Sequence, residues 1–94
     1  MSDYLEVLKR YQDIKEISDL IDDVEKLREY YHSGQYDKMQ QHIQSLMLKY
    51  LTETVIWNSS HTAAPQTPEQ SYQNAETFLC AKARAMMLEK IAND

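Results

Sequence analysis

Apolar residues recur in alternating steps of three and four through the first third of the chain. They are Tyr4, Val7, Tyr11, Ile14, Ile17, Leu20, Val24, Leu27 and Tyr31. This spacing is that of one helical face and predicts a helical region over about residues 3–33. The steps from Tyr11 to Ile14, to Ile17 and to Leu20 are all of three residues, which shifts the phase of the stripe next to Ser18 and Asp19. The pattern therefore predicts either one long helix bent near Ser18 and Asp19 or two nearly collinear helices.

The remainder of the chain predicts two more helices. The second stripe runs Tyr36, Met39, Ile43, Leu46, Met47, Tyr50, Leu51, Val55 and Trp57, and predicts an amphipathic helix over about 36–57 with a wide core face. Polar and small residues without periodicity fill positions 58–67 and predict a loop. A third stripe, with Tyr72, Leu79 and Met86 on one face, predicts a helix over about 68–92.

Helix boundaries have their own signals. Asp3 with Glu6, and Asp37 with Gln40, have the spacing of a capping box. Gly34 suits the left-handed residue that closes many helices. Thr67 as N-cap, followed by Pro68 at the first helical position, marks the start of the last helix.

The composition fits a small all-α domain. The chain has 94 residues with only one Gly and two Pro, so turns are few and elements are long. We expect a single helical domain over residues 1–94: a long or bent N-terminal helix, a second amphipathic helix and a C-terminal helix. A chain this short has a modest core, so assembly into a homo-oligomer is a common way for it to bury more surface.

Charge and apolar content exclude several classes of function. The net charge of −5 argues against broad binding to DNA. No apolar run approaches the ~20 residues that span a bilayer. The N-terminus lacks a signal-peptide segment, and a lone Cys80 cannot form an internal disulfide, so we expect a cytoplasmic protein.

The sequence offers no convincing catalytic or metal-binding motif. His32, His42 and His61 do not pair at metal-ligand spacing. A single glycine excludes glycine-rich phosphate loops. We interpret Cys80 as a buried thiol, and we expect Asp22 and Asp23 to form a solvated acidic face. We therefore expect neither a metal nor a cofactor, and a protein that is not an enzyme.

Seven tyrosines leave two interpretations open. Tyr4 and Tyr11 lie on the first stripe, where an aromatic ring usually belongs to a core or a subunit interface. A tyrosine face can also stack on a nucleobase, an interaction of roughly 1–3 kcal/mol per base. Taken alone, the basic residues of this region indicate ordinary surface charge; they are Lys9, Arg10, Lys15, Lys26 and Arg28.

Four runs of the chain resemble a family of small tailed-phage proteins, the anti-CBASS cyclic-oligonucleotide sponges. The runs are YLEVLKRYQDIKEISDLIDDVEKLREYYHSGQYDKMQQHIQ, LKYLTE, TPEQSY and FLCAKARAMMLEKI. The resemblance implies a helical homohexamer that evades host defence in the cytoplasm of the infected bacterium. It implies binding of a cyclic dinucleotide, such as cyclic GMP-AMP, between protomers without cleavage. Some members also hold a cyclic trinucleotide at a separate site between subunits.

The resemblance also implies roles for two residues. A tyrosine that contacts the bases matches Tyr11, and a lysine that engages the phosphates matches Lys26. Tyr4, Leu8 and Lys15 lie in the same region and are further candidate contacts.

On one straight helix the fifteen residues from Tyr11 to Lys26 span about 22 Å at ~1.5 Å per residue. We therefore expect the two residues to meet across an antiparallel pair of first helices. If the pair crosses between Ser18 and Asp19, Tyr11 of one chain faces Lys26 of the other, and Lys15 faces Asp22.

Two other classes of function compete with a nucleotide sponge. A helical protein-interaction module, such as a phage inhibitor of a host protein, would bury Tyr11 in its seam and leave Lys26 dispensable. An enzyme that degrades the nucleotide needs a general base or a metal cluster, which the sequence does not supply.

Overall fold

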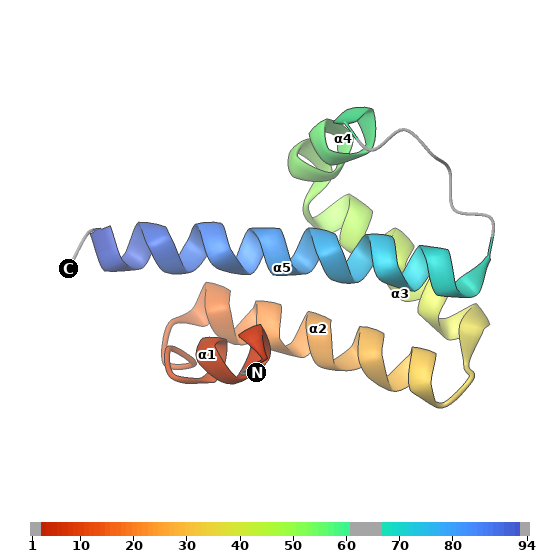
Figure 1. Ribbon diagram of the computed structural model, residues 1–94, viewed down its shortest axis with the longest axis horizontal. Coiled ribbons are helices and arrows are strands. Elements are labelled where there is room, and N and C mark those ends of the chain that lie inside the picture. Colours follow the sequence, from red (N-terminus) through yellow and green to blue (C-terminus); the bar gives the residue numbers. More distant parts are fainter. Residues whose placement is uncertain (1–2, 61–66, 93–94) are drawn as a thin grey trace.

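The computed structural model describes residues 3–60 and 67–92, which form five α-helices and no strand (Figure 1). The helices are α1 (Tyr4–Lys9), α2 (Lys15–His32), α3 (Tyr36–Lys49), α4 (Leu51–Ser60) and α5 (Pro68–Ala92). The all-α class predicted from the sequence is therefore confirmed.

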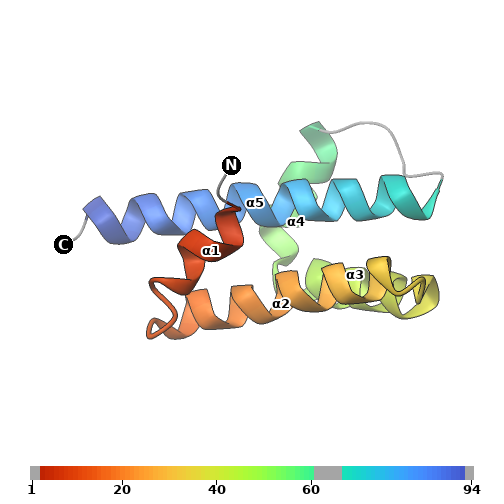
Figure 2. The same ribbon diagram turned by 60° about the horizontal axis from the view of Figure 1, so that its bottom comes forward.

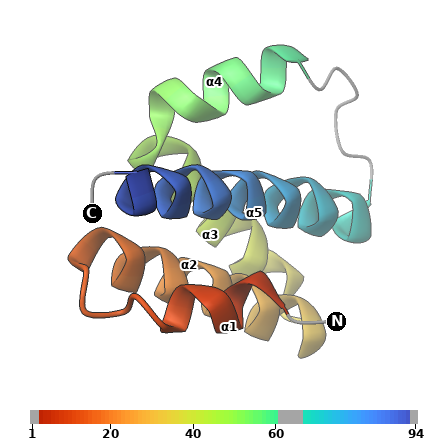
Figure 3. The same ribbon diagram turned by 60° about the vertical axis from the view of Figure 1, so that its left-hand side comes forward.

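The long helices α2 and α5 lie side by side, and α3 turns back along α2 (Figures 1 and 2). The short helix α1 crosses from α5 to α2 and contacts both (Figure 2). Helix α4 leaves the end of α3 on the side of α5 away from α1 and α2 (Figure 3). The resulting core draws on α1, α2, α3 and α5. Its buried apolar residues are Leu5, Leu8, Ile17, Leu20, Ile21, Val24, Leu27, Met39, Leu46, Ala75, Phe78, Leu79 and Ala83.

The prediction of one bent helix, or of two collinear helices, over residues 3–33 is wrong. The chain turns between Arg10 and Ile14, whereas Ser18 and Asp19 lie within α2. Ile14 has extended backbone angles and precedes the first residue of α2. The turn folds α1 back on its own protomer, so that Leu8 is fully buried. Burial against α2 and α5 thus outweighs the continuity of the helical stripe, and the chain breaks about one turn before the predicted point.

The predicted helix over 36–57 is divided at Tyr50. This residue leaves the helical conformation, with φ −115° and ψ 46°, and α4 begins at the next position. Met39 and Leu46 are buried as expected, but Leu51 and Val55 are exposed. The stripe is wide in the sequence, but its second half does not reach the core because α4 departs in another direction.

Most of the residues predicted to begin or end a helix do so in the fold. The Asp3 side chain accepts a hydrogen bond from Leu5 N–H, and Thr67 Oγ1 accepts one from Gln70 N–H. Gly34 has φ 75°, the left-handed conformation that glycine tolerates best. Helix α3, however, begins at Tyr36, so its N-cap position is Gln35 and not Asp37. Of the predicted 58–67 loop, residues 58–60 belong to α4, and 61–66 lie outside the described residues.

Arg28 joins three parts of the chain. Its guanidinium donates hydrogen bonds to both carboxylate oxygens of Asp3 and, at 2.7 Å, to Glu76 Oε1. Tyr4 also donates to Glu76 Oε1, at 2.6 Å, and its ring lies under Arg28. The interpretation of Arg28 as ordinary surface charge is therefore wrong: this cluster fastens α1 to α2 and α5.

Replacing Asp3 with asparagine should lower the free energy of unfolding by about 1 kcal/mol at neutral pH, because a charged pair with a partly exposed carboxylate is lost. The hydrogen bonds from Arg28 hold the pKa of Asp3 below its ordinary value. A lowered pKa stabilises the fold above the ordinary value, and this stabilisation is lost as the pH falls through the folded-state pKa. Urea titrations should therefore show that the wild type has the higher free energy of unfolding at pH 7 and that the difference from Asp3→Asn disappears below about pH 4. An equal difference at pH 7 and below pH 4 would contradict a stabilising role of the Asp3 carboxylate.

Candidate functional site

Tyr11 and Lys26 each present a polar group that has no partner among the described residues. Tyr11 lies in the turn between α1 and α2, where its half-buried ring packs against the core. Lys26 is exposed on α2. Within residues 3–60 and 67–92, neither the Tyr11 hydroxyl nor the Lys26 ammonium makes a hydrogen bond or an ion pair. Both groups can therefore engage a ligand without first breaking an interaction.

The turn after α1 changes the geometry expected for these two residues. They do not lie on one straight helix, so the separation of about 22 Å, calculated from helical rise, does not apply within a protomer. Lys9 Nζ lies 3.8 Å from Glu25 Oε2, which brings the end of α1 to the part of α2 that carries Lys26. One protomer therefore presents Tyr11 from the turn that follows α1 and Lys26 from α2, the helix that α1 contacts. Pairing between two copies remains a separate hypothesis.

The other three candidates are already engaged within the protomer. Leu8 is fully buried, and it holds α1 against the core. The Tyr4 hydroxyl donates to Glu76, and burial raises the pKa of Tyr4 above its ordinary value. Lys15 Nζ lies 3.8 Å from Asp19 Oδ2, one helical turn away. Tyr4 and Leu8 thus support the position of Tyr11 in this protomer.

Arg10 is a candidate that the sequence did not single out. It directly precedes Tyr11, is exposed, and makes no ion pair within the described part of the chain. A guanidinium can bind a phosphate through two parallel hydrogen bonds. Arg10 and Tyr11 both belong to the turn after α1, and only the order Arg-Tyr in the sequence could have drawn attention to Arg10.

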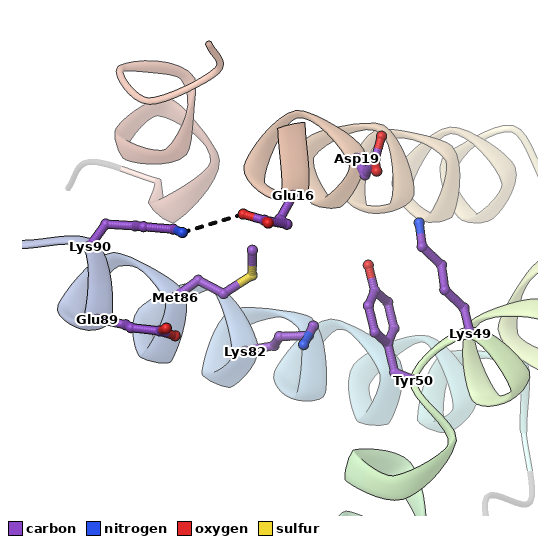
Figure 4. Close-up of a pocket in the computed structure, with 8 residues that line it drawn as sticks. All are labelled: Glu16, Asp19, Lys49, Tyr50, Lys82, Met86, Glu89 and Lys90. Atoms are coloured by element: carbon purple, nitrogen blue, oxygen red, sulfur yellow. Dashed lines mark ion pairs between the residues drawn. The ribbon is translucent and has the colours of Figure 1, made fainter. Parts of the chain in front are cut away.

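A pocket lies between the start of α2, the α3–α4 corner and the C-terminal half of α5 (Figure 4). This pocket has a volume of about 420 Å³. It is lined by Glu16, Asp19, Lys49, Tyr50, Lys82, Met86, Glu89 and Lys90. Neither Tyr11 nor Lys26 belongs to this lining.

The ammonium groups of this pocket are already paired. Lys49 lies 2.9 Å from Asp23, Lys82 3.1 Å from Glu53, and Lys90 3.4 Å from Glu16. Besides its three lysines the lining holds three carboxylates, so it has no net charge. A phosphate would have to compete with carboxylates for each lysine. The pocket is therefore a poor site for an anion.

The wall of this pocket is formed by Tyr50. Its ring has Lys82 Nζ at 4.5 Å and Lys49 Nζ at 5.3 Å from the centroid, and its hydroxyl donates to Asp23 at 2.8 Å. Burial, together with the Asp23 carboxylate, raises the pKa of Tyr50. Asp23 itself is only 8% exposed. The prediction that Asp22 and Asp23 both form a solvated face is therefore wrong for Asp23.

The histidines lie in separate surroundings. His42 Nε2 is 2.9 Å from the Asp23 carbonyl oxygen, and His32 contacts the Tyr31 ring edge-on; His61 lies outside the described residues. In the described ranges, no group of three His, Cys, Asp or Glu side chains could hold a metal ion. Cys80 is partly exposed on α5, where the sequence predicted a buried thiol. None of the helices described has the length and apolar character needed to cross a membrane.

Comparisons with protein families, with characterised proteins and with solved structures find no match to this chain.

Proposed function

We propose that this chain is an anti-CBASS sponge, a phage protein that binds cyclic dinucleotides and sequesters them without cleavage. Cyclic GMP-AMP is the representative ligand, and a cyclic trinucleotide is a second candidate. The protein would act in the cytoplasm of the infected bacterium as a homo-oligomer, a hexamer by the resemblance. The observation that carries the proposal is that Tyr11, in the turn after α1, and Lys26, on α2, each keep a polar group without a partner among the described residues.

The chemistry of the two side chains suits such a ligand. The Tyr11 ring can stack on a base, since every base has a π-face. The Lys26 ammonium can donate charge-assisted hydrogen bonds to a phosphate, each worth roughly 1.5–3 kcal/mol. A ligand with two bases and two phosphates would use two copies of this arrangement. The proposed site therefore lies between two protomers related by a two-fold axis, each of which supplies Tyr11 and Lys26.

The test is titration calorimetry with cyclic GMP-AMP on the wild-type protein and on Tyr11→Ala and Lys26→Ala. Each substitution should weaken binding about tenfold to a hundredfold, because one stacking contact or one charged contact is lost per copy. Lys38→Ala is the matched control, since Lys38 is also exposed and has no partner among the described residues. It should bind as the wild type does.

Two results would contradict the proposal. The first is the absence of binding heat with any cyclic nucleotide offered to the wild-type protein. The second is recovery of linear nucleotide after the complex is denatured, because a sponge returns its ligand intact. An inhibitor of a host protein, the alternative function, predicts no nucleotide binding and no effect of Lys26→Ala.

A further inference from the structure

Helix α1 is too short to keep its place in the fold by itself. It has six residues, whereas an isolated helix of fewer than about 12–15 residues is marginal in water. The position of α1 therefore depends on its contacts with α2 and α5 (Figure 2). Leu5 and Leu8 supply the apolar part of these contacts, because both side chains are buried in the core.

The polar part of these contacts centres on Arg28 of α2. We call Asp3, Tyr4, Arg28 and Glu76 the Arg28 cluster. The guanidinium donates from two nitrogen atoms to Asp3, which caps α1, and from two to Glu76 on α5. The side chains of Arg28 and Glu76 are only 25% and 19% exposed, so water competes weakly for their hydrogen bonds. Only the planar fork of an arginine binds two carboxylates in this way, because the ammonium of a lysine has a single nitrogen.

The main chain connects the position of α1 to Tyr11. The Tyr11 amide donates to the carbonyl oxygen of Leu8 at 2.9 Å, and the Ile14 amide donates to that of Tyr11 at 3.0 Å. Leu8 belongs to α1, and Ile14 directly precedes α2. A displacement of α1 would therefore move Leu8 and the Tyr11 backbone with it. Lys26 would stay in place, because it lies on α2.

We propose that Arg28 is a positioning residue for the nucleotide site: it holds α1 against α2 and α5, and thereby sets the place of the Tyr11 ring. This inference rests on the proposed function, which assigns the contact with a base to Tyr11. Arg28 does not itself bind the phosphate, because Asp3 and Glu76 already occupy its guanidinium. A nucleotide that uses Tyr11 binds the form in which α1 is docked, so nucleotide binding and the docking of α1 favour each other.

The first test is hydrogen exchange of the full chain without nucleotide, in the wild type and in Arg28→Lys. The amides of Arg10 and Tyr11 should exchange about tenfold to a hundredfold faster in the variant, because charge-assisted hydrogen bonds that hold α1 are lost. The amides of α3 should change much less, since α3 does not contact the Arg28 cluster through any printed hydrogen bond or ion pair. Arg84→Lys is the matched control: Arg84 is exposed on α5 without a partner among the described residues, and its variant should exchange like the wild type.

The second test is a double-mutant cycle with cyclic GMP-AMP, measured by calorimetry. In the wild-type background, Arg28→Lys should raise the dissociation constant about threefold or more, because only molecules with a docked α1 bind. In a Tyr11→Ala background the same substitution should change it by less than about twofold, because the ring that Arg28 positions is absent. A residue that touched the phosphate itself would weaken binding by the same factor in both backgrounds.

Three results would overturn the proposal. The first is unchanged exchange at Arg10 and Tyr11 in Arg28→Lys. The second is an equal increase of exchange in α3, which would mean that the substitution loosens the whole fold. The third is a wild type that binds the nucleotide while Arg28→Lys has no effect, or has the same effect in both backgrounds. If Arg28→Lys does not fold, Asp3→Asn weakens the cluster only at its α1 end, and the same comparisons apply to it.

The two tests separate this inference from the proposed function. A wild type that binds no cyclic nucleotide would contradict the sponge function and, with it, the role of Arg28 toward that ligand. Faster exchange in Arg28→Lys would in that case still show that Arg28 holds the turn that carries Tyr11, because the exchange experiment contains no nucleotide.

Discussion

Asp23→Ala should lower the free energy of unfolding by about 2–3 kcal/mol. The Asp23 carboxylate is nearly buried, and its Oδ2 accepts hydrogen bonds from Lys49 Nζ at 2.9 Å and from the Tyr50 hydroxyl at 2.8 Å. Alanine removes both interactions. Lys49 is partly exposed and can return to water, but the half-buried Tyr50 hydroxyl loses its partner. The estimate therefore lies below the 3–5 kcal/mol expected when a fully buried ion pair is broken.

Chemical denaturation followed by circular dichroism measures this loss. Asp22→Ala is the matched control, because Asp22 is the neighbouring carboxylate and is exposed; its effect should stay within about 0.5 kcal/mol. Asp23→Asn should lose more stability than Asp22→Ala and less than Asp23→Ala. The amide oxygen can still accept a hydrogen bond from Tyr50, but it no longer forms an ion pair with Lys49. Equal losses for Asp22→Ala and Asp23→Ala would show that Asp23 does not fix the α3–α4 corner.

Signals that depend on a few neighbouring residues could be predicted from the sequence. The left-handed conformation of Gly34 and the start of α5 at Pro68 both follow from local chemistry, and both are found in the fold. Glycine has no Cβ to clash, and proline lacks only an N–H that the first turn leaves unpaired. Such preferences hold whatever the rest of the chain does.

Features that depend on distant parts of the chain could not be predicted. Asp22 and Asp23 are adjacent aspartates that the sequence does not distinguish. They differ in the fold because Lys49 and Tyr50, at the end of α3, bind only Asp23. The position of the first turn was missed for the same reason. A straight helix satisfies the stripe through Ile14, but it would leave Leu8 without α2 and α5 to pack against.

In the candidate site, too, the residue types could be predicted from the sequence, whereas their positions depend on the fold. Tyr11 and Lys26 were identified by resemblance, and the fold adds that Tyr11 lies in the turn after α1 and Lys26 on α2, with polar groups that have no partner among the described residues. Arg10 precedes Tyr11 in the same turn. Leu51 and Val55 continue the stripe of α3 in the sequence, which predicts a core face, but they are exposed because the chain changes direction at Tyr50.

Leu79→Ala should produce the largest loss of stability, about 3–4 kcal/mol. Leu79 is fully buried on α5, the helix that contacts α1, α2 and α3. Alanine would remove apolar contacts and leave a cavity that α2 and α5 cannot close without moving the Arg28 cluster that joins them. Leu88→Ala makes the same chemical change on the same helix at an exposed position, and its effect should stay within about 0.5 kcal/mol.

Self-association could shift both values, because assembly stabilises the folded state by mass action. The two variants should therefore be compared at a low and at a high protein concentration. A difference of about 3 kcal/mol at both concentrations would place the effect of Leu79 in the core of the protomer. A difference that disappears at low concentration would mean that Leu79 acts through assembly, and that the protomer core around α5 is looser than its complete burial indicates.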